Sequence, residues 1–305
     1  GYKAGSAVVT TNDTTAIGWE ALDVATAGEN VAVGGAALGA NTSGTLNTAV
    51  GNWSLDANTT ASENTAFGHN SLTANTTGTG NTGLGKSAME DTTTGSYNAA
   101  VGLNALSNNT TGADNTAVGV NAMLTNTTGA NSIAIGRSAL NGNTTGDNNV
   151  AIGKEALFTL AGAYHNNIAI GFNALKLSAV NSENIAIGAY AMDATNSASS
   201  TQCTAVGTYS MSGALAGYGN TALGDSTMKV ATSAFENTAI GRSALVALTT
   251  GDNTVAVGSY ALTAQTTGGN NTGIGTSAMD GLTTGSNNVG LGHGAGDALT
   301  TGGNN

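Results

Sequence analysis

Proline is absent from this chain, and cysteine, aromatic and charged residues are scarce. A lone cysteine, Cys203, excludes an internal disulfide framework. Seven lysines and arginines against 18 acids give a net charge of −11, which argues against a nucleic-acid partner. No apolar run is long enough to predict a membrane span, and no signal-peptide pattern is present. With 40% hydrophobic residues, the composition is nevertheless not that of a disordered chain.

Glycine is plentiful, and one set of glycines recurs with a fixed period. Thirteen of the 16 intervals in this set are 17 residues long, and the others are 16, 18 and 19. Such a period predicts a stacked solenoid with one coil per repeat, here an all-β parallel β-solenoid of about 18 coils over residues 1–305. These residues, called the repeat glycines below, are Gly18, Gly34, Gly51, Gly68, Gly85, Gly102, Gly119, Gly136, Gly153, Gly171, Gly188, Gly207, Gly224, Gly241, Gly258, Gly275 and Gly292.

The residues before each repeat glycine alternate between large and small. Aliphatic or β-branched residues stand one and three places before it, with Ala or Gly between them, and this alternation predicts a β-strand. We expect the large residues to fill a thin core and the small column to face outward, where another sheet can approach closely. The predicted trimer-interface column is Ala32, Ala49, Ala66, Gly83, Ala100, Ala117, Ala134, Ala151, Ala169 and Ala186.

A second column, four places after the repeat glycine, holds Leu or Met in nearly every coil. Because Leu and Met match in volume, their interchange indicates a buried position. The predicted core column is Leu22, Leu55, Met89, Leu106, Met123, Leu140, Met192, Met211, Met228 and Met279. We expect a short second strand here, followed by a Thr-Thr-Gly corner whose glycine has a positive φ.

The repeats resemble a known family of surface proteins. Residues 115–119 (NTAVG), 132–136 (SIAIG) and 184–188 (NIAIG) are similar to the head repeats of trimeric autotransporter adhesins of the YadA type. The fuller unit, NTAIGxxAL with NTTG, also looks like repeats of phage tail fibres. The resemblance spans the chain and implies a left-handed parallel β-roll, three chains wide, used for attachment. The repeats of this chain differ from the adhesin head repeat in length, because the adhesin repeat is shorter than 17 residues. The sequence also lacks a membrane-anchor barrel, a coiled-coil stalk and a tail-fibre chaperone module.

The remaining polar residues give weak functional signals. Acids occupy columns five places before and five after the repeat glycine, which indicates solvated loop charge or, alternatively, a cation site. The Asn column four places before the glycine predicts a structural ladder. Cys203 replaces Asn in that column, either as a small polar substitute or as an interchain thiol contact. His69, His165 and His293 lie far apart, and the exposed aromatics are not expected to form one line.

The sequence therefore predicts a non-enzymatic fibre shaft with no catalytic, cofactor or metal site. We expect an extracellular homotrimer, continued end to end in a longer cell-surface or virion fibre that projects a receptor-binding tip. One alternative is an adhesin or glycan-binding surface along the variable columns, for which Trp19, Trp53 and Phe172 are candidates. A remote alternative is an ice-binding solenoid, although adjacent threonines should point to opposite sides. Five Asn-Thr-Thr triplets also fit the glycosylation sequon, at Asn58, Asn75, Asn109, Asn126 and Asn143.

Overall fold

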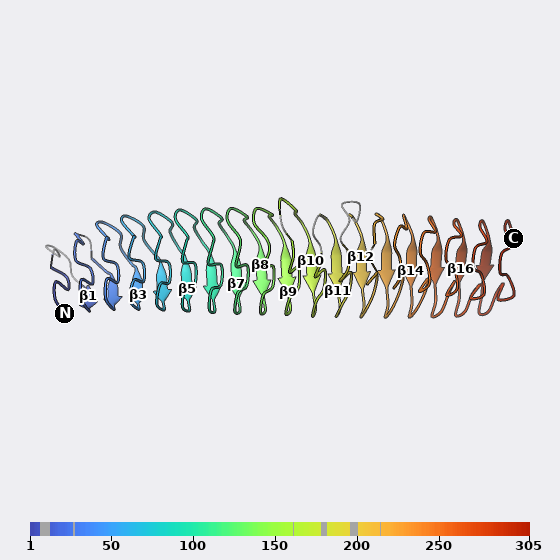
Figure 1. Cartoon of the computed structure of the whole chain (residues 1–305), viewed down its shortest axis with the longest axis horizontal. Helices are drawn as coiled ribbons and strands as arrows, with labels where there is room; N and C mark the ends of the chain where they lie inside the picture. The colour runs from blue at the N-terminus through green and yellow to red at the C-terminus, as the bar shows by residue number, and fades with distance from the viewer. Residues whose placement is uncertain (7–12, 27, 161, 178–181, 196–200, 214) are drawn as a thin grey trace. The chain divides into compact units, whose positions relative to one another are not determined.

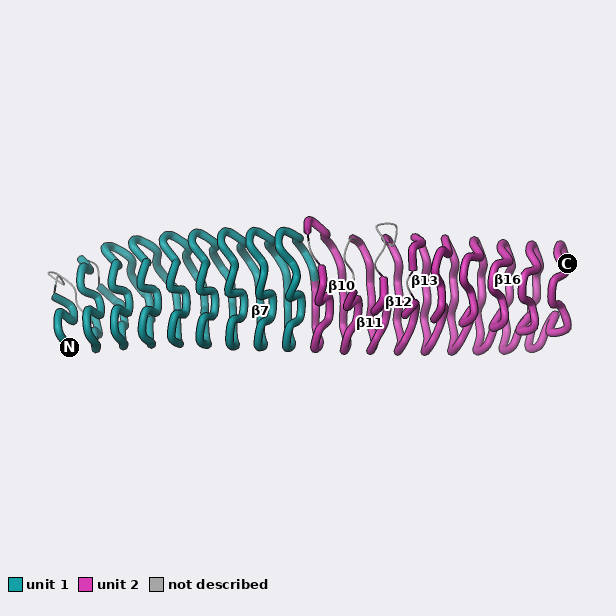
Figure 2. Tube along the Cα trace, in the orientation of Figure 1, with its two compact units in different colours: residues 1–149 teal, residues 150–305 magenta. Residues whose placement is uncertain are grey.

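The computed structural model describes the whole chain except residues 7–12, 27, 161, 178–181, 196–200 and 214. Residues 1–149 and 150–305 form two compact units (Figure 2). Each unit is a parallel β-solenoid with a spacing of about 17 residues, and the described residues contain no α-helix. The prediction of an all-β parallel solenoid is confirmed.

Each coil contributes one three-residue strand that ends directly before a repeat glycine, and the strands lie side by side within each unit (Figure 1). Equal columns pair in register, so that Ala32 lies opposite Ala49. Unit 1 holds β1 (Thr15–Ile17), β2 (Val31–Val33), β3 (Thr48–Val50), β4 (Thr65–Phe67), β5 (Thr82–Leu84), β6 (Ala99–Val101), β7 (Thr116–Val118) and β8 (Ile133–Ile135). Unit 2 holds β9 (Val150–Ile152), β10 (Ile168–Ile170), β11 (Ile185–Ile187), β12 (Thr204–Val206), β13 (Thr221–Leu223), β14 (Thr238–Ile240), β15 (Val255–Val257), β16 (Thr272–Ile274) and β17 (Val289–Leu291).

The repeat glycines turn the chain out of the strand. Their φ angles lie between +120° and +144°, a region that is almost restricted to glycine. They also touch the neighbouring coil, because a Cβ built on Gly102 would lie 2.6 Å from the carbonyl oxygen of Gly119. The period of the sequence is therefore set by a backbone position that no other residue can occupy without strain.

The predicted second strand is absent, because this part of each coil is a series of turns. The Leu or Met of the core column has a φ between +48° and +54°, a left-handed conformation that interrupts an extended strand. Hydrogen bonds to the next coil continue nevertheless, as from the N–H of Leu55 to the carbonyl of Ser71 at 3.1 Å. Successive coils are thus bonded to each other along most of their length and not only at the strands.

A third left-handed corner lies five places before each repeat glycine. Most coils place Asn, Asp, Glu or Gly there, but one coil has Leu46, with a φ of +60° and a side chain that is 54% exposed. Because the left-handed conformation costs a non-glycine residue about 1–2 kcal/mol, Leu46→Gly should raise the free energy of unfolding by about 1 kcal/mol. Thermal denaturation would show this as a higher Tm. Leu103→Gly, at an exposed position outside the left-handed region, should instead lower the Tm.

The predicted core column is confirmed, since its ten side chains are fully buried. The predicted trimer-interface column, in contrast, is wrong. Ala32, Ala49, Ala66, Ala100, Ala117, Ala134, Ala151, Ala169 and Ala186 are fully buried within their own chain, and Gly83 is buried with them. The strand faces are therefore reversed: the small residue points inward, and the large residues on either side of it point outward.

The narrow interior of the coil explains this reversal. A Cβ on Gly83 would lie 2.6 Å from the Oγ of Ser71 and 3.4 Å from the Cε of Met89. A Cβ on Gly273 would lie 3.1 Å from the Cδ1 of Leu262. The Leu or Met column thus fills the interior, and the facing strand has room only for Ala or Gly.

The glycine of the Thr-Thr-Gly corner is required for a different reason from the predicted one. Gly95 and Gly112 do not have a positive φ. A Cβ on Gly95 would instead lie 2.4 Å from the carbonyl oxygen of Gly112 in the next coil. Glycine is selected here by the close stacking of coils.

Candidate functional site

The outward face of the strands is a regular surface feature of each unit. Each strand presents its first and third residues to solvent, and these are Val, Ile, Leu, Phe, Thr or Ala. In unit 1 the third residues include Ile17 (59% exposed), Phe67 (54%), Leu84 (45%), Val101 (36%) and Ile135 (39%). Because the register is exact from strand to strand, these side chains form one apolar strip in each unit. This outer strand face was missed because the alternation in the sequence does not say which residues point inward.

The Asn column is the structural ladder that the sequence predicts. The Oδ1 of Asn98 accepts a hydrogen bond from the N–H of Asn115 at 3.0 Å, and its Nδ2 donates to the carbonyl of Gly112 at 2.9 Å. The column is buried wherever Asn occupies it. Both ends of each amide are used within the fold, so these residues present no surface to a ligand.

A second Asn ladder contains the sequon residues. The Nδ2 of Asn58 donates to Asn41 Oδ1 at 2.8 Å, and the Nδ2 of Asn126 donates to Asn109 Oδ1 at 2.8 Å. All five sequon asparagines, Asn58, Asn75, Asn109, Asn126 and Asn143, are fully buried. An oligosaccharide on any of them is incompatible with the folded coil.

This second ladder is interrupted at Thr92, whose buried Oγ1 has no hydrogen-bond partner, as is also the case for Asn75 Oδ1. Thr92→Asn should join the two halves by donating to Asn75 and accepting from Asn109. Since an unsatisfied buried polar group costs about 1–3 kcal/mol, we expect the free energy of unfolding to rise by about 1–2 kcal/mol. Denaturant titration would measure this. The control, Thr94→Asn at an exposed position, should leave the stability unchanged.

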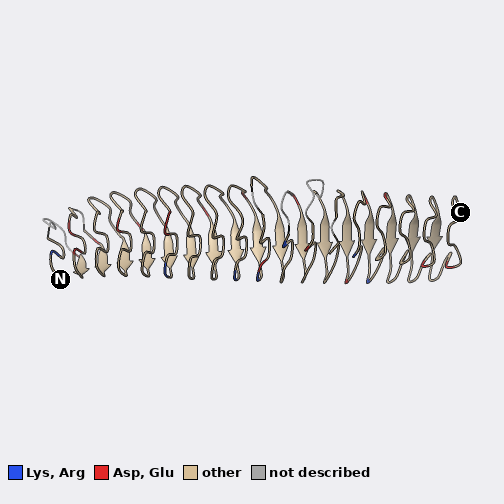
Figure 3. Cartoon of the chain, viewed as in Figure 1, with Lys and Arg blue, Asp and Glu red and all other residues tan. Residues whose placement is uncertain are grey.

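The charged residues are distributed along the coils without forming a metal centre (Figure 3). The acids five places before the repeat glycine occupy exposed left-handed corners, which agrees with solvated loop charge. Among the described residues, no group of three or more His, Cys, Asp or Glu side chains could hold a metal ion. In the same part of the chain, no helix is long and apolar enough to cross a membrane.

Cys203 is a buried substitute for Asn in the ladder. Its N–H donates to Asn184 Oδ1 at 3.1 Å, as an Asn at this position would do. The thiol is fully buried and lies 3.5 Å from the carbonyl of Gly217, and burial raises its pKa. The substitute interpretation is confirmed, and the alternative of an interchain thiol contact is wrong, because the sulfur points into its own coil.

The aromatic residues form a short stack in unit 2, contrary to expectation. Phe172 and Tyr190 meet edge to face at 5.2 Å between ring centroids, and Tyr190 stacks on Tyr209 at 5.0 Å and 6°. Lys154 lies 5.4 Å from the ring centroid of Phe172, and Lys229 lies 4.9 Å from that of Tyr209. The sequence did not reveal this stack because Phe172 stands one place after its repeat glycine and the tyrosines stand two places after theirs.

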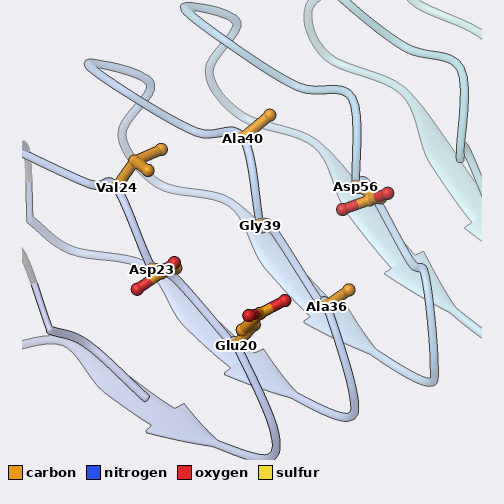
Figure 4. Close-up of a pocket in the computed structure, with 7 residues that line it drawn as sticks. All are labelled: Glu20, Asp23, Val24, Ala36, Gly39, Ala40 and Asp56. Atoms are coloured by element: carbon orange, nitrogen blue, oxygen red, sulfur yellow. The ribbon is translucent and has the colours of Figure 1, made fainter. Parts of the chain in front are cut away.

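Two hollows lie over one coil of unit 1, the coil that follows Gly34. The first is lined by three carboxylates, Glu20, Asp23 and Asp56, and its floor is formed by small residues of that coil (Figure 4). The Nζ of Lys3 lies 3.8 Å from Glu20 and 3.7 Å from Asp23. Burial raises the pKa of Asp56.

The second hollow is lined by Trp19, Gly35, Asn52 and Trp53. The N–H of Gly35 donates to Asn52 Oδ1 at 2.9 Å, and Trp53 meets His69 edge to face at 5.1 Å. Both tryptophans were candidates in the sequence, but the hollow between them was not foreseen. Its signal is the small residues Gly35, Ala36 and Gly39, in columns where most other coils carry longer side chains.

No family model matches the chain, and no curated protein matches it at a significant level.

Proposed function

We propose that the chain is the shaft of a non-enzymatic extracellular fibre, on a cell surface or a virion, and that three copies pack through their outer strand faces. The observation that carries the proposal is the outer strand face, in which the third residue of every strand is Val, Ile, Leu or Phe and the first is Thr, Val, Ile or Ala. An attachment tip carried elsewhere in the fibre would then be held away from its base by the stacked coils.

The extent of this strip supports self-association. A three-residue strand spans about 10 Å, and the eight strands of unit 1 cover about 34 Å, so the whole outer strand face of that unit, threonines included, occupies on the order of 350 Å². The apolar strip of third residues runs along this face, and a continuous exposed apolar patch is often functional. The nine strands of unit 2 repeat the same pattern. A partner that presents the same face, with the same repeat, would cover the strip.

The resemblance to trimeric adhesin repeats supports three as the number of copies. In residues 115–119 and 132–136, the side chains that carry the resemblance are divided between the two faces of the strand. The Ala fills the coil, and the β-branched or aliphatic residues beside it form the proposed interface. The small column is then required by the coil itself and not by the neighbouring subunit.

A matched pair of double variants tests the interface. Val101→Lys with Val118→Lys places two charges on the outer strand face. Leu103→Lys with Val120→Lys places the same charges on the same coils, two residues further on, at side chains that are 43% and 41% exposed. Because buried unpaired lysines oppose association, only the first pair should release monomers.

Light scattering gives the result directly. The unsubstituted protein should show three times the chain mass of 29.5 kDa, and the control pair should show the same. The interface pair should show the mass of one chain while keeping its far-UV circular dichroism spectrum. A monodisperse monomer for the unsubstituted protein, or identical masses for both pairs, would contradict the proposal.

A further inference from the structure

The hollow between Trp19 and Trp53 is produced by a missing side chain in an otherwise filled column. Most coils carry a substantial side chain directly after the repeat glycine, but the coil between the two tryptophans has Gly35. The tryptophans are the only two in the chain, and their side chains are 55% and 46% exposed. Two large aromatic surfaces therefore border one opening whose floor is a glycine.

The spacing of the coils gives the size of the opening. Trp19 and Trp53 belong to coils that lie two steps apart, or about 9.6 Å at ~4.8 Å per coil. Cation–π attraction acts within ~6 Å of a ring centroid, and Trp is the strongest aromatic partner. The opening that the two indoles border therefore spans about two coil steps, which suits one compact group.

The charges next to this opening are mainly negative. Glu20 directly follows Trp19, and Asp56 lies three residues after Trp53, on the wall of the adjoining hollow (Figure 4). Gly35 and Ala36 are consecutive, so the two hollows adjoin. Three carboxylates against Lys3 leave two uncompensated negative charges beside the indoles. An anionic ligand is repelled here, and a cationic one is attracted.

We propose that this hollow binds an organic ammonium cation of the trimethylammonium type, held between Trp19 and Trp53 with the neighbouring carboxylates completing the charge balance. Cation–π contact with the indoles, next to the negative charge of the adjoining hollow, is the chemistry that selects a weakly hydrated quaternary amine over a metal ion or a neutral group. A phosphate ester of the same amine binds more weakly, because its phosphate meets Glu20, Asp23 and Asp56.

The aromatic stack in unit 2 does not offer the same site. Tyr190 and Tyr209 cover each other's faces, and Lys229 already occupies the exposed face of Tyr209. Both ring faces of Tyr209 are thus already covered by side chains of the same chain. Of these two aromatic groups in the described chain, the tryptophan pair is the one that combines half-exposed rings, a floor without a side chain and neighbouring negative charge.

Tryptophan fluorescence tests the proposal on the full chain, since both reporters border the site. Choline chloride should quench or shift the emission with saturation, after correction by NaCl at equal ionic strength. The neutral isostere 3,3-dimethylbutan-1-ol should bind at least ~10-fold more weakly, because it lacks the charge. Trimethyl-lysine should bind as choline does, and phosphocholine more weakly than either.

Gly35→Leu fills the hollow and provides the decisive variant. A Cβ on Gly35 meets no atom closer than 3.5 Å, and the hollow above it gives room for the rest of the side chain, so the Tm should stay unchanged. This variant should lose the saturable signal, whereas Tyr97→Ala, which removes an exposed aromatic ring elsewhere in unit 1, should keep it. Equal responses to choline and its neutral isostere, no saturation by choline, or unchanged binding in a folded Gly35→Leu variant would each overturn the proposal. None of these measurements depends on the number of subunits.

Discussion

Gly102→Ala should lower the free energy of unfolding by about 3 kcal/mol or more, which makes it one of the most damaging single-methyl additions possible in this chain. Two costs combine. The φ of +134° is strained for any residue with a Cβ, at about 1–3 kcal/mol. The added methyl also meets the carbonyl oxygen of Gly119 at 2.6 Å, which is backbone and moves only if the coils separate.

Gly35→Ala is the control for this experiment. Gly35 has neither a positive φ nor a close neighbour, so its substitution should be neutral or stabilising by about 0.4–1 kcal/mol, through the reduced entropy of the unfolded chain. Thermal and denaturant unfolding of both variants would provide the comparison. Hydrogen exchange should place the weakened amides of Gly102→Ala around the coils of Gly102 and Gly119. Equal stabilities of the two variants would contradict the stacking argument.

Asn98→Leu should be similarly damaging, for a polar reason. The substitution leaves the N–H of Asn115 buried without a partner, and it removes one of the two hydrogen bonds to the carbonyl of Gly112, which keeps the bond from Asn109 Nδ2. At about 1–3 kcal/mol for the unsatisfied N–H and about 1 kcal/mol for the second lost hydrogen bond, the expected loss is about 2–4 kcal/mol. The increase in apolar character at a fully enclosed site does not compensate, because the ladder bond to the next coil is broken.

Asn108→Leu makes the same chemical change ten residues later, at an exposed side chain. This control should alter the free energy of unfolding by no more than about 0.5 kcal/mol. Denaturant midpoints measured for both variants at one protein concentration would separate ladder loss from any effect on association. A midpoint for Asn98→Leu equal to that of Asn108→Leu would show that the ladder contributes little.

The sequence was sufficient for the coil and its core column, because both follow from periodicity. Met89 and Leu106 interchange freely in one column, and this pattern is found only where volume alone matters. The orientation of the strand was not accessible in the same way. Ala117 lies between two β-branched or aliphatic residues, and alternation is equally compatible with either face inward. What decides the matter is the width of the coil, which depends on the left-handed turns at positions such as Met123.

The surface sites depended on contacts between coils that the sequence does not display. Trp19 and Trp53 are 34 positions apart and occupy different columns, so only the structure shows that they border one hollow. The contact of Phe172 with Tyr190 was missed for the same reason, since these two rings come from adjacent columns. The buried state of the sequon residue Asn126 likewise follows from the ladder and not from the triplet that it begins.

The uniform register between neighbouring coils has a consequence for how such a chain can change over generations. Neighbouring strands within each unit keep the same register, as from Ala49 to Ala66 and from Ala100 to Ala117, and most described coils repeat the same glycine contact. Duplicating or deleting one whole repeat in the gene therefore creates no junction that the fold does not already contain. Recombination can therefore lengthen or shorten the solenoid by one coil at a time, while the residues in the surface columns remain free to diverge.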